Sequence, residues 1–286
     1  MKVVKDKDSI SIYSQNDFNI KDILECGQIF SYVKVNNNEY DVISTDKLAK
    51  VCVNNNVTTI YSNNLEYFYE FFDLKTNYNL IKNQILDINK DYSKYVKLGS
   101  GIRILKQDAF QTIISFIVSA NNNIKRIKNI LFKMSQKFGD KIENSDYYAF
   151  PALKQLLRAN EKDFYELGAG YRSEYLVDTL KKLSTEQYSI SNLKKMPTEL
   201  LKKQLLSLKG VGPKVADCIL LFGFSRTDVF PVDTWVRKAY YNIETKKLSD
   251  EKISYYFVSI FKNISGYAQQ YLFNYMLNYS QKDKNS

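Results

Sequence analysis

A lysine and an aspartate stand near two predicted helix starts, and together they could form and stabilise a covalent amine adduct. Lys214 directly follows Pro213, a residue suited to the first helical position. Asp233 precedes Thr234 in the manner of a helix N-cap. An amine is nucleophilic only when neutral, and a helix N-terminus, partial burial and neighbouring cations each disfavour the charged form. A capping carboxylate stays ionised, so it could still accept a proton or stabilise a cation.

The turn before Lys214 has the composition of an anion site. Gly210 and Gly212 permit a tight turn, which would leave backbone N–H groups pointing outward at the positive end of the next helix. Such groups bind phosphate oxygens well. Two simpler interpretations stay open at this point: Lys214 could be an ordinary surface lysine, and Asp233 could serve only as a cap.

Two kinds of periodicity divide the chain. Four short segments rich in β-branched or aromatic residues, separated by Asn clusters, predict an antiparallel sheet near the start: 9–13, 40–44, 49–53 and 57–61. From Leu65 onward the apolar spacing is helical, with half-buried helices predicted over 110–117 and over 124–134 before Gly139. Gly223 is the expected stop of the helix that begins at Pro213. The fold class is therefore α+β with a dominant helical part.

Composition limits the chemistry. The 286 residues include 41 Lys plus Arg against 31 Asp plus Glu, and the net charge of +10 favours a polyanionic partner. No histidine is present, which excludes an imidazole base or metal ligand. Three scattered cysteines give neither a disulfide framework nor a four-cysteine iron–sulfur site. Without an apolar signal segment or membrane-length run, we expect a cytoplasmic protein with no membrane partner.

The segment 208–238 resembles the helix-hairpin-helix motif and following Gly/Pro…Asp loop of the DNA glycosylase superfamily (HhH-GPD), in which a lysine at position 214 marks the bifunctional members. Five further segments resemble the 8-oxoguanine DNA glycosylases in chain order and extend the match to almost the whole chain: 26–30, 101–108, 116–126, 167–172 and 268–273. Endonuclease III-like relatives carry an iron–sulfur cluster, so the cysteine pattern disfavours them.

The resemblance implies an organisation and an activity. Residues 1–105 would form an N-terminal antiparallel sheet domain with helices, and residues 106–286 a helical glycosylase domain with the hairpin motif at about 200–222. The protein would excise 8-oxoguanine from damaged duplex DNA, preferably opposite cytosine, in base excision repair. A Lys Schiff base and β-elimination would add apurinic/apyrimidinic lyase activity, with no metal or other cofactor. We expect a monomer, associated with the nucleoid of a prokaryotic cell.

The resemblance also assigns residues to the damaged base. The main-chain carbonyl of Gly27 would accept from the N7–H that distinguishes 8-oxoguanine from guanine, and Gln269 would read the Watson–Crick edge. The Ala-Gln-Gln-Tyr run leaves Gln270 as the alternative to Gln269, although Phe273 lies four residues after Gln269 and so on the same helix face. Three side chains would contact the base as packing groups: Phe273, Cys218 and Phe116.

Other positions would contact DNA around the lesion. Asn121 would fill the gap left by the flipped base and Tyr171 would wedge into the stack, while Arg126 and Arg172 would donate to the orphaned cytosine. The hairpin residues would bind phosphate: Lys209, Gly210, Val211 and Gly212. Trp235 stands where the family often has a phosphate-contacting histidine, and uncharged indole cannot replace that cation. Arg237 and Lys238 are nearby substitutes.

Two other functions remain open. The first is an enzyme of the same superfamily that removes other oxidised or alkylated bases, although the alkyl-base branch lacks the lysine at position 214. The second is a non-catalytic DNA-binding module that uses the hairpin only to grip phosphates. A Schiff base, which borohydride can trap, would distinguish an enzyme from such a module.

Overall fold

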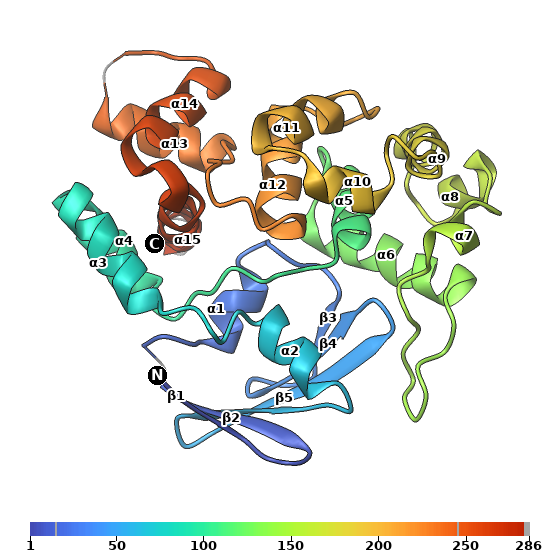
Figure 1. Cartoon of the computed structure of the whole chain (residues 1–286), viewed down its shortest axis with the longest axis horizontal. Coiled ribbons are helices and arrows are strands. Elements are labelled where there is room, and N and C mark those ends of the chain that lie inside the picture. The colour runs from blue at the N-terminus through green and yellow to red at the C-terminus, as the bar shows by residue number, and fades with distance from the viewer. Residues whose placement is uncertain (15, 245, 283–286) are drawn as a thin grey trace.

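The computed structural model describes residues 1–14, 16–244 and 246–282. Within them, an antiparallel sheet of order β1-β2-β6-β5-β4-β3 forms one end of the molecule and helices form the rest (Figure 1). The strands are β1 (Lys2–Lys5), β2 (Ser9–Tyr13), β3 (Tyr32–Lys34), β4 (Glu39–Ser44), β5 (Lys47–Asn54) and β6 (Val57–Tyr61). The α+β class and the four predicted strands are confirmed. The two edge strands, β1 and β3, were not predicted, because they are too short to show a clear alternation.

Alternating burial along the strands shows which face of the sheet packs in the core. Ile10 and Ile12 of β2 point inward, and Ile60 of β6 lies directly opposite Ile10. This apolar face packs with the buried side chains of α1 (Ile20–Glu25) and α2 (Leu65–Phe71) in one core. Figure 1 shows both helices between the sheet and the remaining helices.

After α2 the described chain forms helices joined by loops. The helices are α3 (Tyr78–Ile88), η1 (Lys90–Tyr92), α4 (Ser93–Leu98), α5 (Ala109–Ser119), α6 (Ile124–Phe138), α7 (Leu153–Leu156), α8 (Glu161–Glu166), α9 (Arg172–Leu183), α10 (Ile190–Lys195), α11 (Thr198–Leu206), α12 (Pro213–Gly223), α13 (Thr234–Ile243), α14 (Asp250–Phe261), η2 (Lys262–Ile264) and α15 (Ser265–Lys282). The predicted ends at Gly139 and Gly223 are confirmed: Gly139 caps α6, and Gly223 is the last residue of α12.

Helix α12 lies near the centre of the molecule, between the group α13–α15 and the group α5–α9 (Figure 1). Every residue from Val215 to Gly223 is buried, and α12 packs against α5 and α11. A helix buried on all sides has little freedom to shift. Its first turn, which carries Lys214, therefore has a fixed place relative to the surrounding helices.

A separate core joins α3 and α4 to the C-terminal helices. Ile85 and Tyr95 pack in one cluster with Phe230, Phe257 and Tyr271. The sheet domain expected over residues 1–105 therefore contributes two helices to a core that it shares with the end of the chain. The boundary at residue 105 stays a prediction, and it divides the chain more sharply than the packing does.

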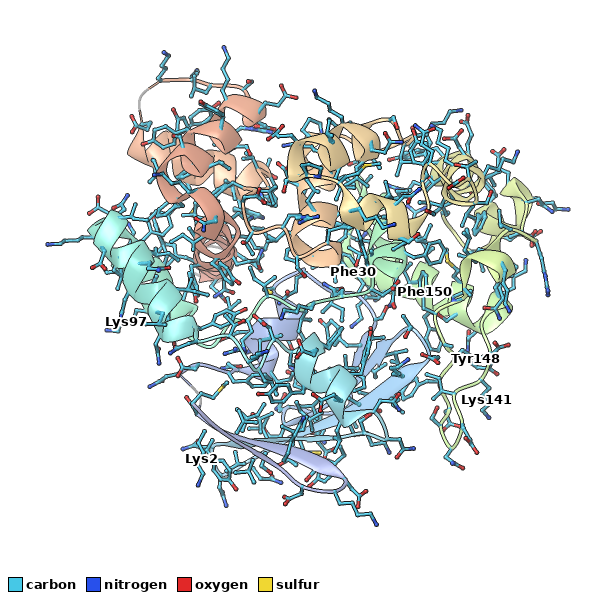
Figure 2. The ribbon with its side chains drawn as sticks, in the orientation of Figure 1. Lys2, Phe30, Lys97, Lys141, Tyr148 and Phe150 are labelled. Carbon is cyan, nitrogen blue, oxygen red and sulfur yellow. The ribbon has the colours of Figure 1, made fainter. Side chains whose placement is uncertain are left out.

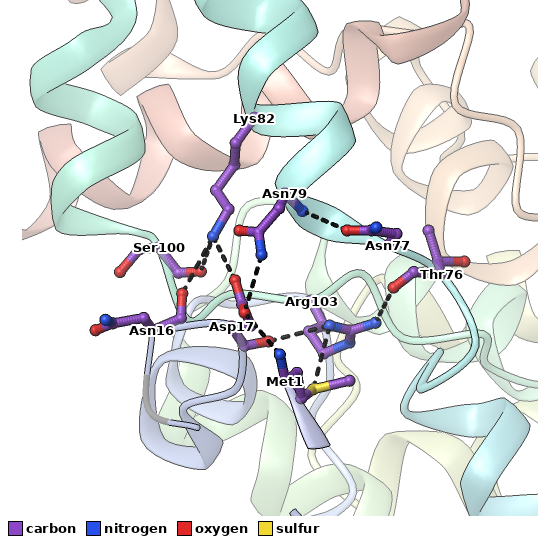
Figure 3. Close-up of polar contacts among 9 residues, drawn as sticks. All are labelled: Met1, Asn16, Asp17, Thr76, Asn77, Asn79, Lys82, Ser100 and Arg103. Carbon is purple, nitrogen blue, oxygen red and sulfur yellow. Dashed lines mark hydrogen bonds and ion pairs between the residues drawn. The ribbon is translucent and has the colours of Figure 1, made fainter. Parts of the chain in front are cut away.

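Arg103 fixes the segment that crosses from the sheet to the helices. The side chain is fully buried, and its guanidinium donates to the carbonyls of Asp17 and Thr76 (Figure 3). It also donates to the carbonyls of Phe72 and Asp73 and stacks over the Tyr78 ring. A planar cation with five donors suits a site formed by several carbonyls. This contact joins the segment after β2, the turn after α2 and the connection before α5.

Candidate active site

The hairpin between α11 and α12 requires glycine at its tip. Gly210 has φ +78°, and a Cβ built there would lie 2.3 Å from a ring carbon of Tyr175. Gly212 is the N-cap of α12 and Pro213 is its first residue, so no side chain of the cap residue accepts from the first backbone N–H groups of the helix. The predicted turn and helix start are confirmed. The phosphate site that they would form stays a prediction.

Lys214 and Asp233 come together at one cavity. Lys214 is half-buried in the first turn of α12, with its ammonium nitrogen 5.6 Å from the centre of the Phe116 ring. Asp233 is the N-cap of α13, as predicted, and its Oδ1 accepts from the backbone N–H groups of Trp235 and Val236, both at 2.9 Å. The cap therefore uses one carboxylate oxygen, and the carboxylate also lines the cavity.

The cavity itself is small, at about 40 Å³. Its wall consists of Cys26, Gly27, Lys214, Cys218, Phe222, Pro231, Asp233, Gln269, Gln270 and Phe273. Pockets that hold a whole small-molecule ligand usually measure about 300 to 1,000 Å³, so this volume is too small for a purine. A flipped purine would have to displace side chains from the wall.

Most of the predicted base-contacting residues meet at this wall: Gly27, Cys218, Gln269 and Phe273. Phe116 is not part of this wall, and its ring stacks on that of Phe222 at 5.7 Å between centroids. Three wall residues were missed: Cys26, Phe222 and Pro231. The spacing of Phe222 gave a signal, because it follows Lys214 and Cys218 at intervals that place all three on one helix face.

Gln269 and Gln270 are both buried and both reach the cavity. The Gln269 amide donates to the carbonyl of Pro231 at 3.2 Å and accepts from Nε2 of Gln270 at 2.8 Å. The thiol of Cys26 contacts Oε1 of Gln270 at 3.6 Å. The two amides thus form a connected pair, and either could face a base, so both assignments remain.

The two thiols at the wall are neutral groups at physiological pH. Burial raises the pKa of Cys218 to about 11, although the neighbouring Lys214 amine partly lowers it. Burial likewise raises the pKa of Cys26 to about 12. No thiolate therefore faces Lys214 from Cys26 or Cys218 at this wall.

The residues expected around the lesion lie where α6 and α9 begin: Asn121 and Tyr171 precede these helices, and Arg126 and Arg172 lie in their first turns. Asn121 and Tyr171 are exposed, and Asn121 has φ +49°, in the left-handed region that asparagine enters more readily than most residues. Arg126 is also exposed and donates to the carbonyl of Gly168 at 2.9 Å. These three side chains are accessible to a DNA strand.

Arg172 is placed differently from the expected cytosine contact, because its side chain is only 2% exposed. Nε donates to the carbonyl of Ala120 at 2.8 Å, and Nη2 donates to the carbonyl of Asn121 at 2.7 Å. Nη1 donates to the carbonyl of Ala169 at 3.2 Å. In this structure Arg172 holds the loop that presents Asn121 through Nε and Nη2, while Nη1 donates to the turn before α9.

The cations near the hairpin are partly paired. Lys209 forms an exposed ion pair with Glu174 at 2.7 Å, and Val211 is buried. Arg237 makes two 2.6 Å hydrogen bonds to Asp250, which occupy one side of its guanidinium. Lys238 is exposed, with its amine 4.8 Å from the Trp235 ring. Of the two suggested substitutes for histidine, Lys238 is therefore the better placed.

Neither a metal-binding group nor a membrane helix is found in the part of the chain that the structure describes. Over residues 1–14, 16–244 and 246–282, no three His, Cys, Asp or Glu residues gather in a way that could hold a metal ion. Over the same residues, no helix combines the length and apolar character that crossing a membrane would need.

Two family models match the chain in sequence. Residues 10–113 match the N-terminal domain of 8-oxoguanine DNA glycosylase, and residues 114–260 match the HhH-GPD superfamily of base excision DNA repair proteins. The boundary between the matches falls within α5, eight residues after the division predicted at residue 105.

Named relatives agree with these matches. The N-glycosylase/DNA lyase of Saccharomyces cerevisiae is 39% identical over 50% of this chain, which spans only 42% of the yeast protein. The probable N-glycosylase/DNA lyase of Methanothermobacter thermautotrophicus is 30% identical over 74% of this chain and 73% of its own length.

One solved structure matches nearly the whole chain. The 8-oxoguanine glycosylase/lyase of Clostridium acetobutylicum, in complex with double-stranded DNA containing cytosine opposite 8-oxoguanine, has a TM-score of 0.90 and 37% identity. The match covers 98% of this chain and 99% of that one. This chain therefore belongs to the HhH-GPD superfamily of base excision DNA repair proteins, and it carries the N-terminal domain of the 8-oxoguanine DNA glycosylases.

Proposed function

We propose that this protein is a bifunctional DNA glycosylase that excises 8-oxoguanine from duplex DNA and then cleaves the strand as a lyase. The observation that carries this proposal is the shared cavity of Lys214 and Asp233, with Gly27 and Phe273 on its wall. An amine, a carboxylate, a main-chain acceptor and an aromatic ring are the groups that this reaction needs.

The first step joins the enzyme to the sugar. Neutral Lys214 attacks C1′ of the deoxyribose, the bond from C1′ to N9 breaks, and its electron pair leaves with the oxidised base. The carboxylate of Asp233, whose Oδ1 caps α13, stabilises the positive charge that develops on the sugar. The C1′–O4′ bond then breaks and a proton from Nζ passes to O4′, which opens the sugar ring and leaves a cationic Schiff base between Nζ of Lys214 and C1′.

The second step breaks the strand. The cationic Schiff base acidifies the C2′–H bond, a base removes that proton, and the electron pair forms the C2′–C3′ double bond as the 3′ phosphate leaves. Hydrolysis of the Schiff base then frees Lys214. The expelled 8-oxoguanine is the candidate proton acceptor, as the family resemblance implies.

Recognition depends on a difference of one proton. 8-Oxoguanine carries an N7–H donor where guanine has an acceptor, so a fixed acceptor such as the Gly27 carbonyl favours the damaged base. Gly27 has φ +81°, a conformation that favours glycine, and the absence of a side chain lets the backbone approach the base. Gln269 or Gln270 would read the opposite edge, and Cys218 and Phe273 would cover the two faces.

The proposed partner is damaged duplex DNA with cytosine opposite the lesion. The net charge of +10 supports binding to phosphates, and the exposed Asn121, Arg126 and Tyr171 support contacts at the vacated position. We further propose that the enzyme acts as a monomer in a prokaryotic nucleoid. The relatives named above include an archaeal and a bacterial protein.

Excision assays on defined duplexes test the proposal. Duplexes that carry 8-oxoguanine opposite each of the four bases should show fastest release opposite cytosine, while duplexes with 3-methyladenine should be poor substrates. Fast release of an alkylated base would instead favour the other branch of the superfamily. Tight DNA binding without release of any base would favour the non-catalytic module.

A further inference from the structure

Gln28 holds the loop that carries Gly27 in a fixed orientation. Its side chain is fully buried, and Nε2 donates to the carbonyls of Ile23 and Arg103, each at 2.8 Å. Oε1 accepts from the backbone N–H of Leu105 at 2.9 Å. Since the two ends of the amide meet opposite kinds of partner, the group fits in only one orientation.

Gln107 connects this loop to the helix that carries Lys214. Its Nε2 donates to the main-chain carbonyl of Gln28 at 2.7 Å, and its backbone N–H donates to the carbonyl of Phe222 at 3.1 Å. Phe222 belongs to the last turn of α12 and lines the cavity. One residue outside the cavity wall thus contacts both the loop and the helix that form it.

Gly27 depends on such external support. It has no side chain to hold its own backbone, and a Cβ built at this position would contact only one atom within 4 Å, a Phe273 ring carbon at 3.9 Å. Glycine samples a wide range of backbone angles. The direction of the Gly27 carbonyl must therefore come from its neighbours, and the peptide group that follows is held by Gln28 and Gln107.

We propose that Gln107 is a positioning residue for recognition of the damaged base, which sets the Gly27 carbonyl at a fixed distance from the amine of Lys214. This inference rests on the proposed function. Gln107 bridges the loop that carries Gly27 and the helix that carries Lys214. This bridge matters while the base is recognised and released, because the Gly27 carbonyl and the Lys214 amine must then contact the same nucleotide. An abasic site presents no base, so attack by Lys214 on that site does not use the bridge.

The Gln107→Met variant tests the assignment, because methionine keeps the length and removes the donor. The assays are single-turnover excision of 8-oxoguanine opposite cytosine and borohydride trapping on an abasic duplex. A small misplacement of a recognition group costs up to roughly 100-fold in rate, so excision should fall roughly 10- to 100-fold while abasic trapping is retained. Gln107→Glu, which offers no amide donor to the Gln28 carbonyl, should show the same separation of the two activities.

Gln111 provides a matched control. It also links the helical part to the sheet, since Oε1 accepts from the N–H of Thr45 at 2.8 Å and Nε2 donates to Oγ of Ser31 at 2.9 Å, but it does not line the cavity. Gln111→Met should therefore keep the wild-type ratio of excision to trapping. Excision is expressed per trappable enzyme, so partial unfolding of either variant does not alter that ratio.

Two results would overturn the assignment. The first is that excision and abasic trapping fall in parallel in Gln107→Met. The second is that the ratio of excision to trapping changes as much in Gln111→Met as in Gln107→Met. A wild-type enzyme that is trapped on abasic DNA but releases no 8-oxoguanine would instead overturn the proposed function, and the assignment of Gln107 with it.

Discussion

Asp233 caps α13 with one carboxylate oxygen while the same residue lines the cavity that it shares with Lys214. Two roles thus meet in one side chain, one structural and one chemical. The cap needs only an acceptor atom, whereas stabilisation of a cationic sugar needs a negative charge. Substitutions can therefore separate the two roles.

Asp233→Asn should keep the fold and lose the chemistry. Asparagine caps helices about as well as aspartate, so thermal unfolding should match wild type, whereas the excision rate should fall because the charge is gone. Asp233→Ala should lose activity and also about 1 kcal/mol of stability, since α13 then lacks its cap. An Asn variant with wild-type excision would show that Asp233 serves only as a cap.

The two hairpin glycines should respond differently to alanine. Gly210→Ala places a Cβ at φ +78° and against the Tyr175 ring, so it should cost about 1 to 3 kcal/mol of stability and weaken DNA binding. Gly212 has φ −90° and no heavy atom within 4 Å of a built Cβ, so Gly212→Ala should leave thermal unfolding nearly unchanged. Equal melting temperatures for the two variants would contradict this account.

The two arginines near the lesion loops should also differ. Arg126 is exposed, so Arg126→Ala should leave stability unchanged. It should reduce the difference in excision rate between cytosine and the other bases opposite the lesion. Arg172 is buried with its donors on loop carbonyls, so Arg172→Ala should lower stability and slow excision opposite every base. The measurement is the excision rate against the four partner bases, together with thermal unfolding. If Arg126→Ala leaves the ranking of partner bases unaltered, the assignment of Arg126 as a contact of the orphaned cytosine is wrong.

Alkaline conditions should destabilise the fold through the buried thiols. Burial raises the pKa of Cys218 from its ordinary value of 9.0 to about 11, so between these values the unfolded chain has lost a proton that the folded protein keeps. Stability contributed by the neutral thiol is complete below pH 9.0 and declines as pH rises toward 11. Cys218→Ser removes this ionisation, so its free energy of unfolding should fall less steeply over that range. Parallel pH dependence in the two proteins would show that Cys218 does not titrate differently on folding.

The sequence predicted those features that have strong local signals. Gly210 permits a turn that other residues resist, Pro213 favours the first helical position and Asp233 favours an N-cap, so the hairpin, the start of α12 and the cap of α13 were all readable. Lys214 could be located for the same reason, because its place follows from the turn before it.

Features that depend on tertiary packing were not readable in this way. The burial of Arg172 arises from loops that meet only in the folded chain, and an arginine in sequence gives no sign of such carbonyl partners. Phe116 has the right character for a base contact, but its ring stacks on Phe222 and is not part of the cavity wall. The contacts of Gln107 join segments that are distant in sequence, so no pattern of residue spacing predicts them.

Borohydride trapping of wild type and Lys214→Gln on a duplex with 8-oxoguanine opposite cytosine tests the central claim most directly. The account predicts a covalent enzyme–DNA adduct with wild type, no adduct with Lys214→Gln, and similar DNA affinity for both proteins in the absence of borohydride. An adduct that persists in Lys214→Gln would place the nucleophile at another amine and contradict the assignment of Lys214.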